Sequence, residues 1–210
     1  FDRGEWDKAQ PIGTALAQKA MRDGDPTTRS EFYRKRGVVA RNVGDPRGAA
    51  DSLITALEVR PTNNTALDDL NSLAREMPDV WDFDTTYKEL EKVYKKRDDA
   101  NALLARVHIG RAALVERDGE LDGAGRFYHE ALQLASTDLT VLSALVDFHG
   151  STRNWKEAIG AIQQFVDAGA PPTDRLAALM RQAAIHADGE MDAQRAIAVL
   201  KHVLQLEPTH

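Results

Sequence analysis

The fold is decided by residues 30–63, which read SEFYRKRGVVARNVGDPRGAADSLITALEVRPTN. Apolar and small residues recur at helical spacing in both halves of this stretch, and Gly44-Asp45-Pro46 separates the halves. Asp45 is a good N-cap, and a proline at the first position of a helix loses no hydrogen bond. Pro61 disfavours a helical conformation in the residue before it, so the second helix should end near Arg60. The stretch therefore predicts two helices joined by a tight turn.

The same pattern recurs along the chain. A small residue in the second half of each copy stands at Ala9, Ala49, Ala124, Ala158 and Ala196, with spacings of 40, 75, 34 and 38 residues. A tryptophan precedes the first and the fourth of these alanines by three residues, at Trp6 and Trp155. The spacing of 75 is about twice the others, so one divergent copy should lie inside it. Periods in the thirties are typical of stacked helix pairs, which predicts an all-α protein.

These copies resemble the tetratricopeptide repeat (TPR) family, whose unit of 34 residues is a pair of antiparallel helices, A and B. In that unit a small residue at the eighth position lets helix A approach helix B, and the twenty-fourth position is large. The residues at the eighth position are Gly37, Ala112, Ala184 and the bulkier Val146. Those at the twenty-fourth are Leu53, Tyr128, Ile162 and Leu200. The resemblance implies a right-handed superhelical solenoid of antiparallel helix pairs.

The resemblance divides the chain into six segments of a single TPR-like solenoid that spans residues 1–210. They are a partial repeat at 1–29, a repeat at 30–63, a divergent repeat at 64–101, and repeats at 102–138, 139–172 and 173–210. In the divergent repeat we expect a long connector and a helix B from Thr85 to Arg97, with Thr86 and Glu89 in capping-box register. The chain starts in mid-repeat and stops without an extra polar helix. Because solenoids need such caps, we expect a fragment of a longer array, or ends that dock onto another surface.

Composition narrows the classes of function. The chain of 210 residues has 27 Lys and Arg against 33 Asp and Glu, a net charge of −6, which argues against nucleic-acid binding. A hydrophobic content of 42% is typical of a soluble globular protein, and no stretch approaches the roughly 20 apolar residues of a membrane span. The absence of cysteine excludes disulfides, zinc-thiolate sites and cysteine nucleophiles. A cytoplasmic location is the default expectation, with the periplasm as the alternative.

The sequence contains no constellation of residues that indicates catalysis. His129 and Glu130 could begin the H-E-x-x-H pattern of zinc proteases, but Gln133 stands where the second histidine is needed. Phosphate-binding glycine loops and the G-x-S-x-G motif are also missing. We therefore predict that the chain is not an enzyme and that it needs neither a cofactor nor a metal.

The resemblance implies a binding groove, because family geometry places helix A on the concave side of the solenoid. Side chains at five positions of each helix A should point into it. The expected groove residues are Arg34, Arg41, Asn42, Asp68, Arg75, Arg106, Ile109, Arg117, Asp147 and Arg181. This set leans basic in an acidic protein. Chaperone-binding members of the family carry an Asn where this chain has Val38, so heat-shock chaperone tails are not the expected ligand.

We accordingly predict a scaffold for protein–protein interaction that binds a peptide segment of another protein in its groove. One alternative is a homo-oligomerisation or spacer module, with Trp81 and Phe83 as exposed interface anchors. These two aromatic residues could instead fold back as a hydrophobic staple on the following helix. Another alternative is a region that recruits substrate for a larger enzyme or assembly.

Overall fold

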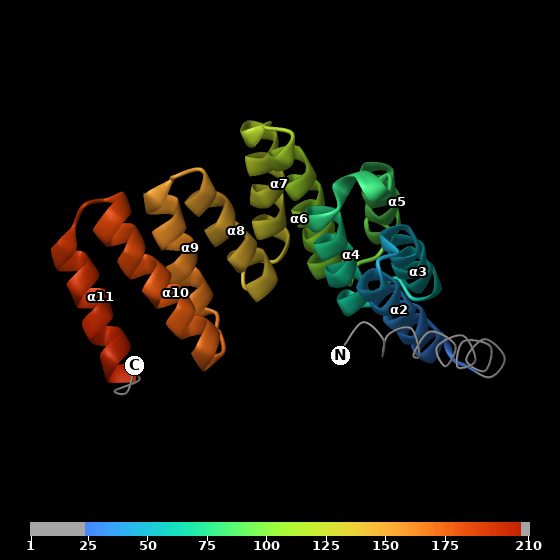
Figure 1. The fold of residues 1–210 in the computed structure, drawn as a ribbon, viewed down its shortest axis with the longest axis horizontal. Helices are drawn as coiled ribbons and strands as arrows, with labels where there is room; N and C mark the ends of the chain where they lie inside the picture. The colour runs from blue at the N-terminus through green and yellow to red at the C-terminus, as the bar shows by residue number, and fades with distance from the viewer. Residues whose placement is uncertain (1–23, 207–210) are drawn as a thin grey trace. The chain divides into compact units, whose positions relative to one another are not determined.

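The computed structural model of the chain describes residues 24–206, and the regular elements within that range are all helices (Figure 1). The prediction of an all-α fold is therefore confirmed. Contacts divide the chain into two compact units, Phe1–Phe127 and Tyr128–His210, and the division falls inside one helix. A single solenoid over 1–210 stays a prediction. The helix expected around Trp6 lies outside the described residues.

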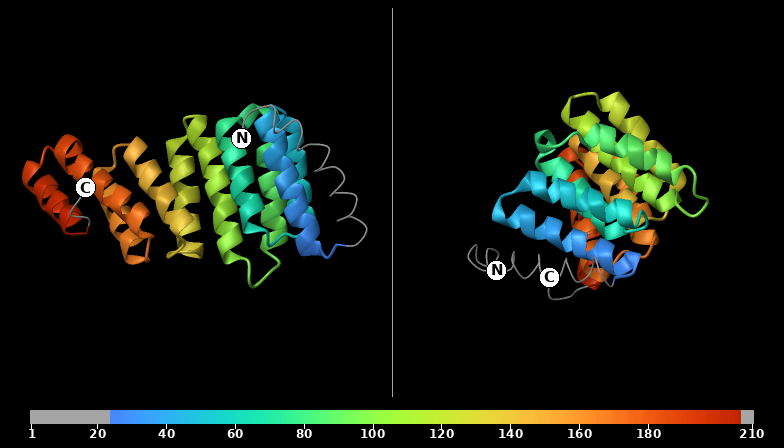
Figure 2. Two further views of the ribbon diagram at one scale, coloured as in Figure 1. Left: turned by 60° about the horizontal axis from the view of Figure 1, so that its bottom comes forward. Right: turned by 90° about the vertical axis from the view of Figure 1, so that its right-hand side faces the viewer.

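The described part of the first unit is a series of packed helices. They are α2 (Pro26–Val43), α3 (Pro46–Val59), α4 (Asn64–Glu76), the short 3₁₀ helix η1 (Pro78–Val80), α5 (Phe83–Tyr94), α6 (Asn101–Arg117) and the beginning of α7 (Leu121–Leu134). Helix α3 packs on α2 and α4, and α6 packs on α4 and α5. Figure 2 shows these helices, coloured from blue to yellow-green, side by side. The division of the chain into six repeat segments stays a prediction, and α2 begins at Pro26, before the predicted start of its repeat at residue 30.

The turn between α2 and α3 follows the local signals of the sequence. Helix α2 ends before Gly44, which takes the left-handed conformation at φ 87° that glycine adopts readily. The Asp45 side chain accepts a 2.9 Å hydrogen bond from the backbone N–H of Gly48, and so caps α3 as predicted. Helix α3 ends at Val59, next to the predicted end at Arg60.

Helices α2 and α3 approach closely at Gly37. A Cβ atom at this position would lie 2.8 Å from Leu53 Cγ and 3.1 Å from the carbonyl oxygen of Ala49. Leu53 is buried, with 2% of its surface exposed. A small residue on the first helix therefore makes room for a large one on the second, which confirms the prediction for this pair.

A buried polar cluster joins the ends of α2, α3 and α4. Ser30 Oγ donates a 2.7 Å hydrogen bond to the carbonyl oxygen of Ala56, and Asn63 Nδ2 donates a 2.8 Å bond to Ser30 Oγ. Asn63 Oδ1 in turn accepts a 3.0 Å bond from the backbone N–H of Ala66, at the start of α4. Because buried polar groups are costly without partners, this cluster holds the three helix ends in one arrangement.

The second pair, α4 and α5, has the enlarged turn that the sequence predicted, with η1 inside it. Helix α5 begins at Phe83 rather than Thr85, because the Asp82 side chain accepts a 3.1 Å hydrogen bond from the backbone N–H of Thr85 and acts as the N-cap. The hydroxyl of Thr86 donates to the carbonyl oxygen of Asp82 at 3.0 Å, within the first turn. The predicted capping box of Thr86 and Glu89 is therefore wrong, since a stronger cap precedes it.

The described part of the second unit is a second series of helix pairs. It contains the remainder of α7, then α8 (Leu139–Ser151), α9 (Trp155–Asp167), α10 (Pro172–Ala184), the π-helix η2 (Ile185–Gly189) and α11 (Ala193–Leu206). Helix α9 packs on α8 and α10, and α11 packs on α10. Asp192 caps α11 by accepting a 3.0 Å bond from the backbone N–H of Arg195. Asn154 precedes α9 but makes no side-chain capping hydrogen bond, and its Nδ2 donates a 3.0 Å bond to Thr152 Oγ1.

Candidate functional site

In the first unit, the surface predicted to bind a peptide lies on three adjacent helices. Helix α4 contacts both α2 and α6. The predicted groove residues on these helices are Arg34, Arg41 and Asn42 from α2, Asp68 and Arg75 from α4, and Arg106, Ile109 and Arg117 from α6. We call this surface the α2–α4–α6 face.

Most arginines of the α2–α4–α6 face are held by a carboxylate on a neighbouring element. The pairs are Arg34–Asp69, Arg41–Glu76, Arg106–Asp68 and Arg117–Asp79. The partners lie 35 or 38 positions apart, which is one repeat of the sequence. The expectation that the groove leans basic needs correction, because carboxylates of the adjacent helices neutralise these arginines.

Arg34 binds two carboxylates at once. Its guanidinium lies 2.7 Å from Asp69 Oδ2 on α4 and 2.8 Å from Glu31 Oε1 on its own helix. Hydrogen bonding to Glu31, and then to Asp69, raises the pKa of Arg34 although burial opposes the change. The hydrogen bond from Arg34 also lowers the pKa of Glu31. Arg34 and Glu31 therefore both stay charged at neutral pH.

Arg75 differs from the other arginines of this face. It is exposed near the end of α4, and no carboxylate within residues 24–206 forms an ion pair with it. It stands seven positions after Asp68, so the two side chains lie on the same side of the helix. Arg75 is therefore a cation of this face that a ligand can reach without breaking an ion pair.

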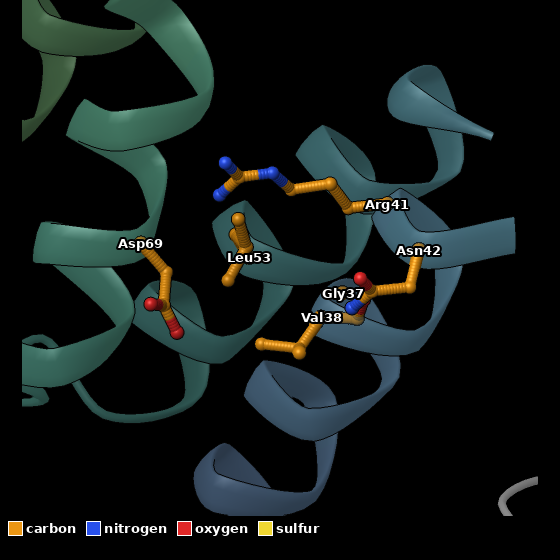
Figure 3. A pocket seen from close by; sticks show the side chains of 6 residues that line it. All are labelled: Gly37, Val38, Arg41, Asn42, Leu53 and Asp69. Carbon is orange, nitrogen blue, oxygen red and sulfur yellow. The ribbon is translucent and has the colours of Figure 1, made fainter. Parts of the chain in front are cut away.

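A pocket of about 240 Å³ opens between α2, α3 and α4 (Figure 3). Its lining residues are Gly37, Val38, Arg41, Asn42, Leu53 and Asp69. Figure 3 shows Arg41 and Asp69 extending from α2 and α4 toward the same space, with Leu53 between them. Val38 and Leu53 supply apolar surface. The volume is below the roughly 300–1,000 Å³ of small-molecule sites, so it suits one side chain of a larger ligand.

Two predicted groove residues have other roles in the structure. Ile109 is only 2% exposed, so it packs between helices and offers no surface to a ligand, which corrects its assignment to the groove. Asn42 Nδ2 donates a 2.8 Å hydrogen bond to the carbonyl oxygen of Val38, one turn earlier on α2. The amide oxygen of Asn42 is the part of this side chain left for contact at the pocket.

In the second unit, too, an arginine binds residues of the preceding helix pair. Arg181 Nη1 on α10 lies 2.5 Å from Asp147 Oδ1 on α8, and Nη2 donates a 3.1 Å bond to the carbonyl oxygen of Val146. A Cβ atom at Gly150 would lie 2.5 Å from Arg181 Nη2, so the glycine leaves space for the guanidinium. The last two predicted groove residues therefore bind each other.

Phe83 and Trp81, the residues predicted as interface anchors, lie in different environments. Phe83 is 1% exposed, and its ring centroid lies 6.5 Å from that of Tyr87, so it belongs to the core of the first unit. This corrects its assignment as an exposed anchor and agrees with the alternative in which it folds back on its own helix. Trp81 is partly exposed, and its indole N–H donates a 3.1 Å hydrogen bond to Thr86 Oγ1.

The carboxylates Asp69 and Glu76 were absent from the sequence-based set of site residues. The signal that could have found them is an acidic residue one repeat after an arginine, since Asp69 follows Arg34 by 35 positions and Glu76 follows Arg41 by the same interval. Pattern positions taken from the family predict which side chains should face the groove. They do not show which of these side chains bind one another across neighbouring helices.

His149 on α8 is partly buried, and this makes it sensitive to pH. Burial lowers the pKa of its imidazole, although the negative charge of Glu157 opposes the shift.

Below the ordinary histidine pKa of about 6.5, the unfolded chain therefore binds a proton at His149 that the folded chain does not. We expect the free energy of unfolding to fall more for the wild type than for His149→Gln as the pH drops from about 7.5 to 5.5. Urea unfolding at each pH measures this, and equal pH dependence in both proteins would contradict it.

Within residues 24–206, no group of three or more His, Asp or Glu side chains is arranged to hold a metal ion. None of the helices described in the structure is long and apolar enough to cross a membrane.

Comparison with known proteins gives structural likeness without close sequence similarity. No protein-family model matches the sequence, and no curated protein matches it. The crystal structure of BtubC (BKLC) from P. vanneervenii superposes with a TM-score of 0.65 and 16% identity, covering 98% of this chain and 89% of that chain. The crystal structure of PilW, a widely conserved type IV pilus biogenesis factor, has a TM-score of 0.54 and 12% identity, with 96% and 95% covered. MamA 41-end from Desulfovibrio magneticus RS-1 has a TM-score of 0.52 and 14% identity, with 86% and 96% covered.

Identities this low show similarity of fold alone. The fold agrees with the sequence pattern, because the second helices of the pairs begin at intervals of 37, 38, 34 and 38 residues and Gly37 meets Leu53 as the repeat requires. The chain therefore has the fold of a TPR-like helical-repeat protein.

Proposed function

We propose that the chain is a non-catalytic scaffold for protein–protein interaction and that its α2–α4–α6 face binds a peptide segment of a partner protein. Helical-repeat proteins use extended surfaces formed by successive repeats to bind their ligands. The observation that carries the proposal is the pocket between α2, α3 and α4, whose lining combines apolar Val38 and Leu53 with polar side chains. Such a pocket holds one apolar side chain of a peptide, while the surrounding polar groups orient the peptide backbone.

The ion pairs on this face restrict the charge of the ligand. An acidic peptide would have to displace Asp69 from Arg34, in a pair that is partly buried, or Glu76 from Arg41, in a pair that is exposed. Arg75 is the cation that a ligand can reach without breaking a pair. We therefore expect a peptide with a central apolar side chain and at most one nearby carboxylate.

Filling the pocket is the direct test. Replacing Val38 with tryptophan should block it, and we expect peptides selected by display on the wild-type chain to bind this variant at least about tenfold more weakly, a loss of about 1.4 kcal/mol. Isothermal titration calorimetry on both proteins measures the difference. The matched control is Val93→Trp on α5, where Val93 is 43% exposed and lines no part of the pocket.

Equal affinity of the wild type and the Val38→Trp variant would contradict the proposal. Charge reversal at Arg34 is a poorer test, because a glutamate there would face Glu31 and Asp69 and destabilise the fold. Arg75→Glu avoids this difficulty. It should weaken only those selected peptides that carry a carboxylate.

A further inference from the structure

The carboxylates bound to the arginines of α2 do not use their oxygens equally. Both oxygens of Glu31 accept hydrogen bonds from Arg34, at 2.8 and 2.9 Å. Both oxygens of Glu76 are also bonded, one by Arg41 and the other by a serine hydroxyl. Asp69 binds Arg34 through Oδ2 alone, and no donor in the described part of the chain bonds its Oδ1. Asp69 therefore keeps one carboxylate oxygen free for a ligand.

Asp69 is one of the residues that line the pocket between α2, α3 and α4. Asn42 lines it too, and its amide oxygen is unused among the described residues, because the bond from Asn42 to the carbonyl oxygen of Val38 is made by Nδ2. Figure 3 shows that Asp69 extends from α4 and Asn42 from α2. Val38 and Leu53 supply the apolar part of the lining. The pocket thus combines apolar surface with two side chains that each have an unused oxygen.

The ion pairs between α2 and α4 leave one negative charge in excess. The charged side chains of these pairs are Arg34, Arg41, Glu31, Asp69 and Glu76. Two of them are cations and three are anions. Arg41 lines the pocket, but its terminal nitrogens bind Glu76 and a serine hydroxyl. Arg75 stands about 9 Å along α4 from Asp69 and does not line the pocket. The charge balance beside the pocket therefore favours a cation.

We propose that this pocket binds a lysine side chain of the partner peptide. The four-carbon stem of the lysine packs on Val38 and Leu53, and its ammonium group donates to Asp69 Oδ1, with the amide oxygen of Asn42 as a further acceptor. An ammonium group has three donors and no acceptor, so it suits the two unused oxygens. This inference rests on the proposed function and narrows it, because the apolar group that fills the pocket becomes the stem of a lysine.

Other side chains fit the pocket less well. A guanidinium binds a carboxylate best through two parallel hydrogen bonds, which need both oxygens. Arg34 already holds Oδ2 of Asp69 at 2.7 Å, so an arginine of the peptide would make only one of these bonds. A purely apolar side chain would shield the free oxygens of Asp69 and Asn42 from water without bonding them, which costs free energy.

The test compares lysine with norleucine, which has the same four-carbon stem and no ammonium group. A random peptide library displayed on phage is selected on the wild-type chain, and the clones that Val38→Trp fails to bind are kept. We expect these clones to share a lysine at one position. The strongest clone is then synthesised with lysine or norleucine at this position. Isothermal titration calorimetry should show that the norleucine peptide binds the wild type at least about tenfold more weakly.

The variant Asp69→Asn tests where the ammonium group binds. Asparagine keeps an oxygen for Arg34 but removes the charge, so the preference for lysine over norleucine should fall to about threefold or less. The matched control is Glu58→Gln on α3, which removes a charge from an exposed side chain that does not line the pocket. It should keep the full preference. Circular dichroism should show the helical content of the wild type in every variant.

Equal affinity of the lysine and norleucine peptides would overturn the inference, and so would selected clones that share an apolar residue instead of lysine. Either result would leave the proposed function standing, because Val38→Trp would still block binding. A preference for lysine that persists unchanged in Asp69→Asn would also overturn the inference, since the ammonium group would then bind elsewhere. If no selected peptide depends on Val38, the inference and the proposed function both fail.

Discussion

Replacing Phe83 with alanine should lower the free energy of unfolding by about 3–5 kcal/mol, the usual range for removing a buried phenylalanine. Phe83 is 1% exposed at the first position of α5, beside Tyr87, which is 0% exposed. The substitution removes the ring and leaves a cavity that neighbours of this size can fill only in part. The midpoint and slope of urea unfolding, followed by circular dichroism, give the difference in free energy.

The control for Phe83→Ala is Val93→Ala on the same helix. Val93 is 43% exposed, and its truncation should change the free energy of unfolding by no more than about 0.5 kcal/mol. The comparison also bears on homo-oligomerisation. If Phe83→Ala left stability unchanged but dissociated an oligomer, Phe83 would be an interface residue and its placement in the core would be wrong.

Replacing Gly110 with alanine should lower the free energy of unfolding by about 2–4 kcal/mol, although alanine favours a helix by about 1 kcal/mol over glycine. A Cβ atom at Gly110 would lie 2.5 Å from Tyr87 Cζ and 2.6 Å from Asn71 Oδ1. Tyr87 Oη donates a 2.8 Å hydrogen bond to Asn71 Oδ1, and Asn71 Nδ2 donates a 3.0 Å bond to the carbonyl oxygen of Arg106. Relieving the clash would therefore disturb a buried hydrogen-bond network as well as the packing.

Gly160 provides the matched control for Gly110. It lies in α9, and no atom comes within 4 Å of a Cβ built there. Gly160→Ala should therefore raise the free energy of unfolding by up to about 1 kcal/mol, through helix propensity alone. The prediction is that these two identical substitutions change stability in opposite directions in urea unfolding. A stabilising effect at both positions would show that α4, α5 and α6 do not approach as closely as described.

Short-range signals made the helices of this chain predictable from the sequence. Asp45 caps α3 and Gly44 ends α2, because these effects depend on residues within one turn of each other. The same reasoning failed where two caps competed. Asp82 and Thr86 both precede a helical pattern, and the backbone N–H of Thr85 is bonded by Asp82. The capping-box motif of Thr86 and Glu89 depends on those two residues alone, whereas Asp82, four residues before Thr86, caps the helix.

The candidate site was less predictable than the helices. The repeat pattern placed Arg34 and Arg41 on the correct helix, but it could not show that Asp69 and Glu76 bind them. Nor could it show that Ile109 is buried, because a single position of a repeat can face either a ligand or the next helix. The carboxylate partners lie about 35 residues away in the sequence, where only packing of one repeat on the next brings them within bonding distance.

The sequence by itself determined that this protein is built from helix pairs, where α3 begins and where it ends to within one residue, and that Gly37 meets Leu53. These features follow from hydrogen bonds within a few residues and from a period that repeats along the chain. Only the tertiary structure decided that most arginines of the α2–α4–α6 face are paired with carboxylates, that a pocket opens beside Val38, and that Phe83 and Ile109 are buried. The reason is that charge pairing, pocket shape and exposure depend on how neighbouring helices pack, and residues far apart in the sequence set that packing.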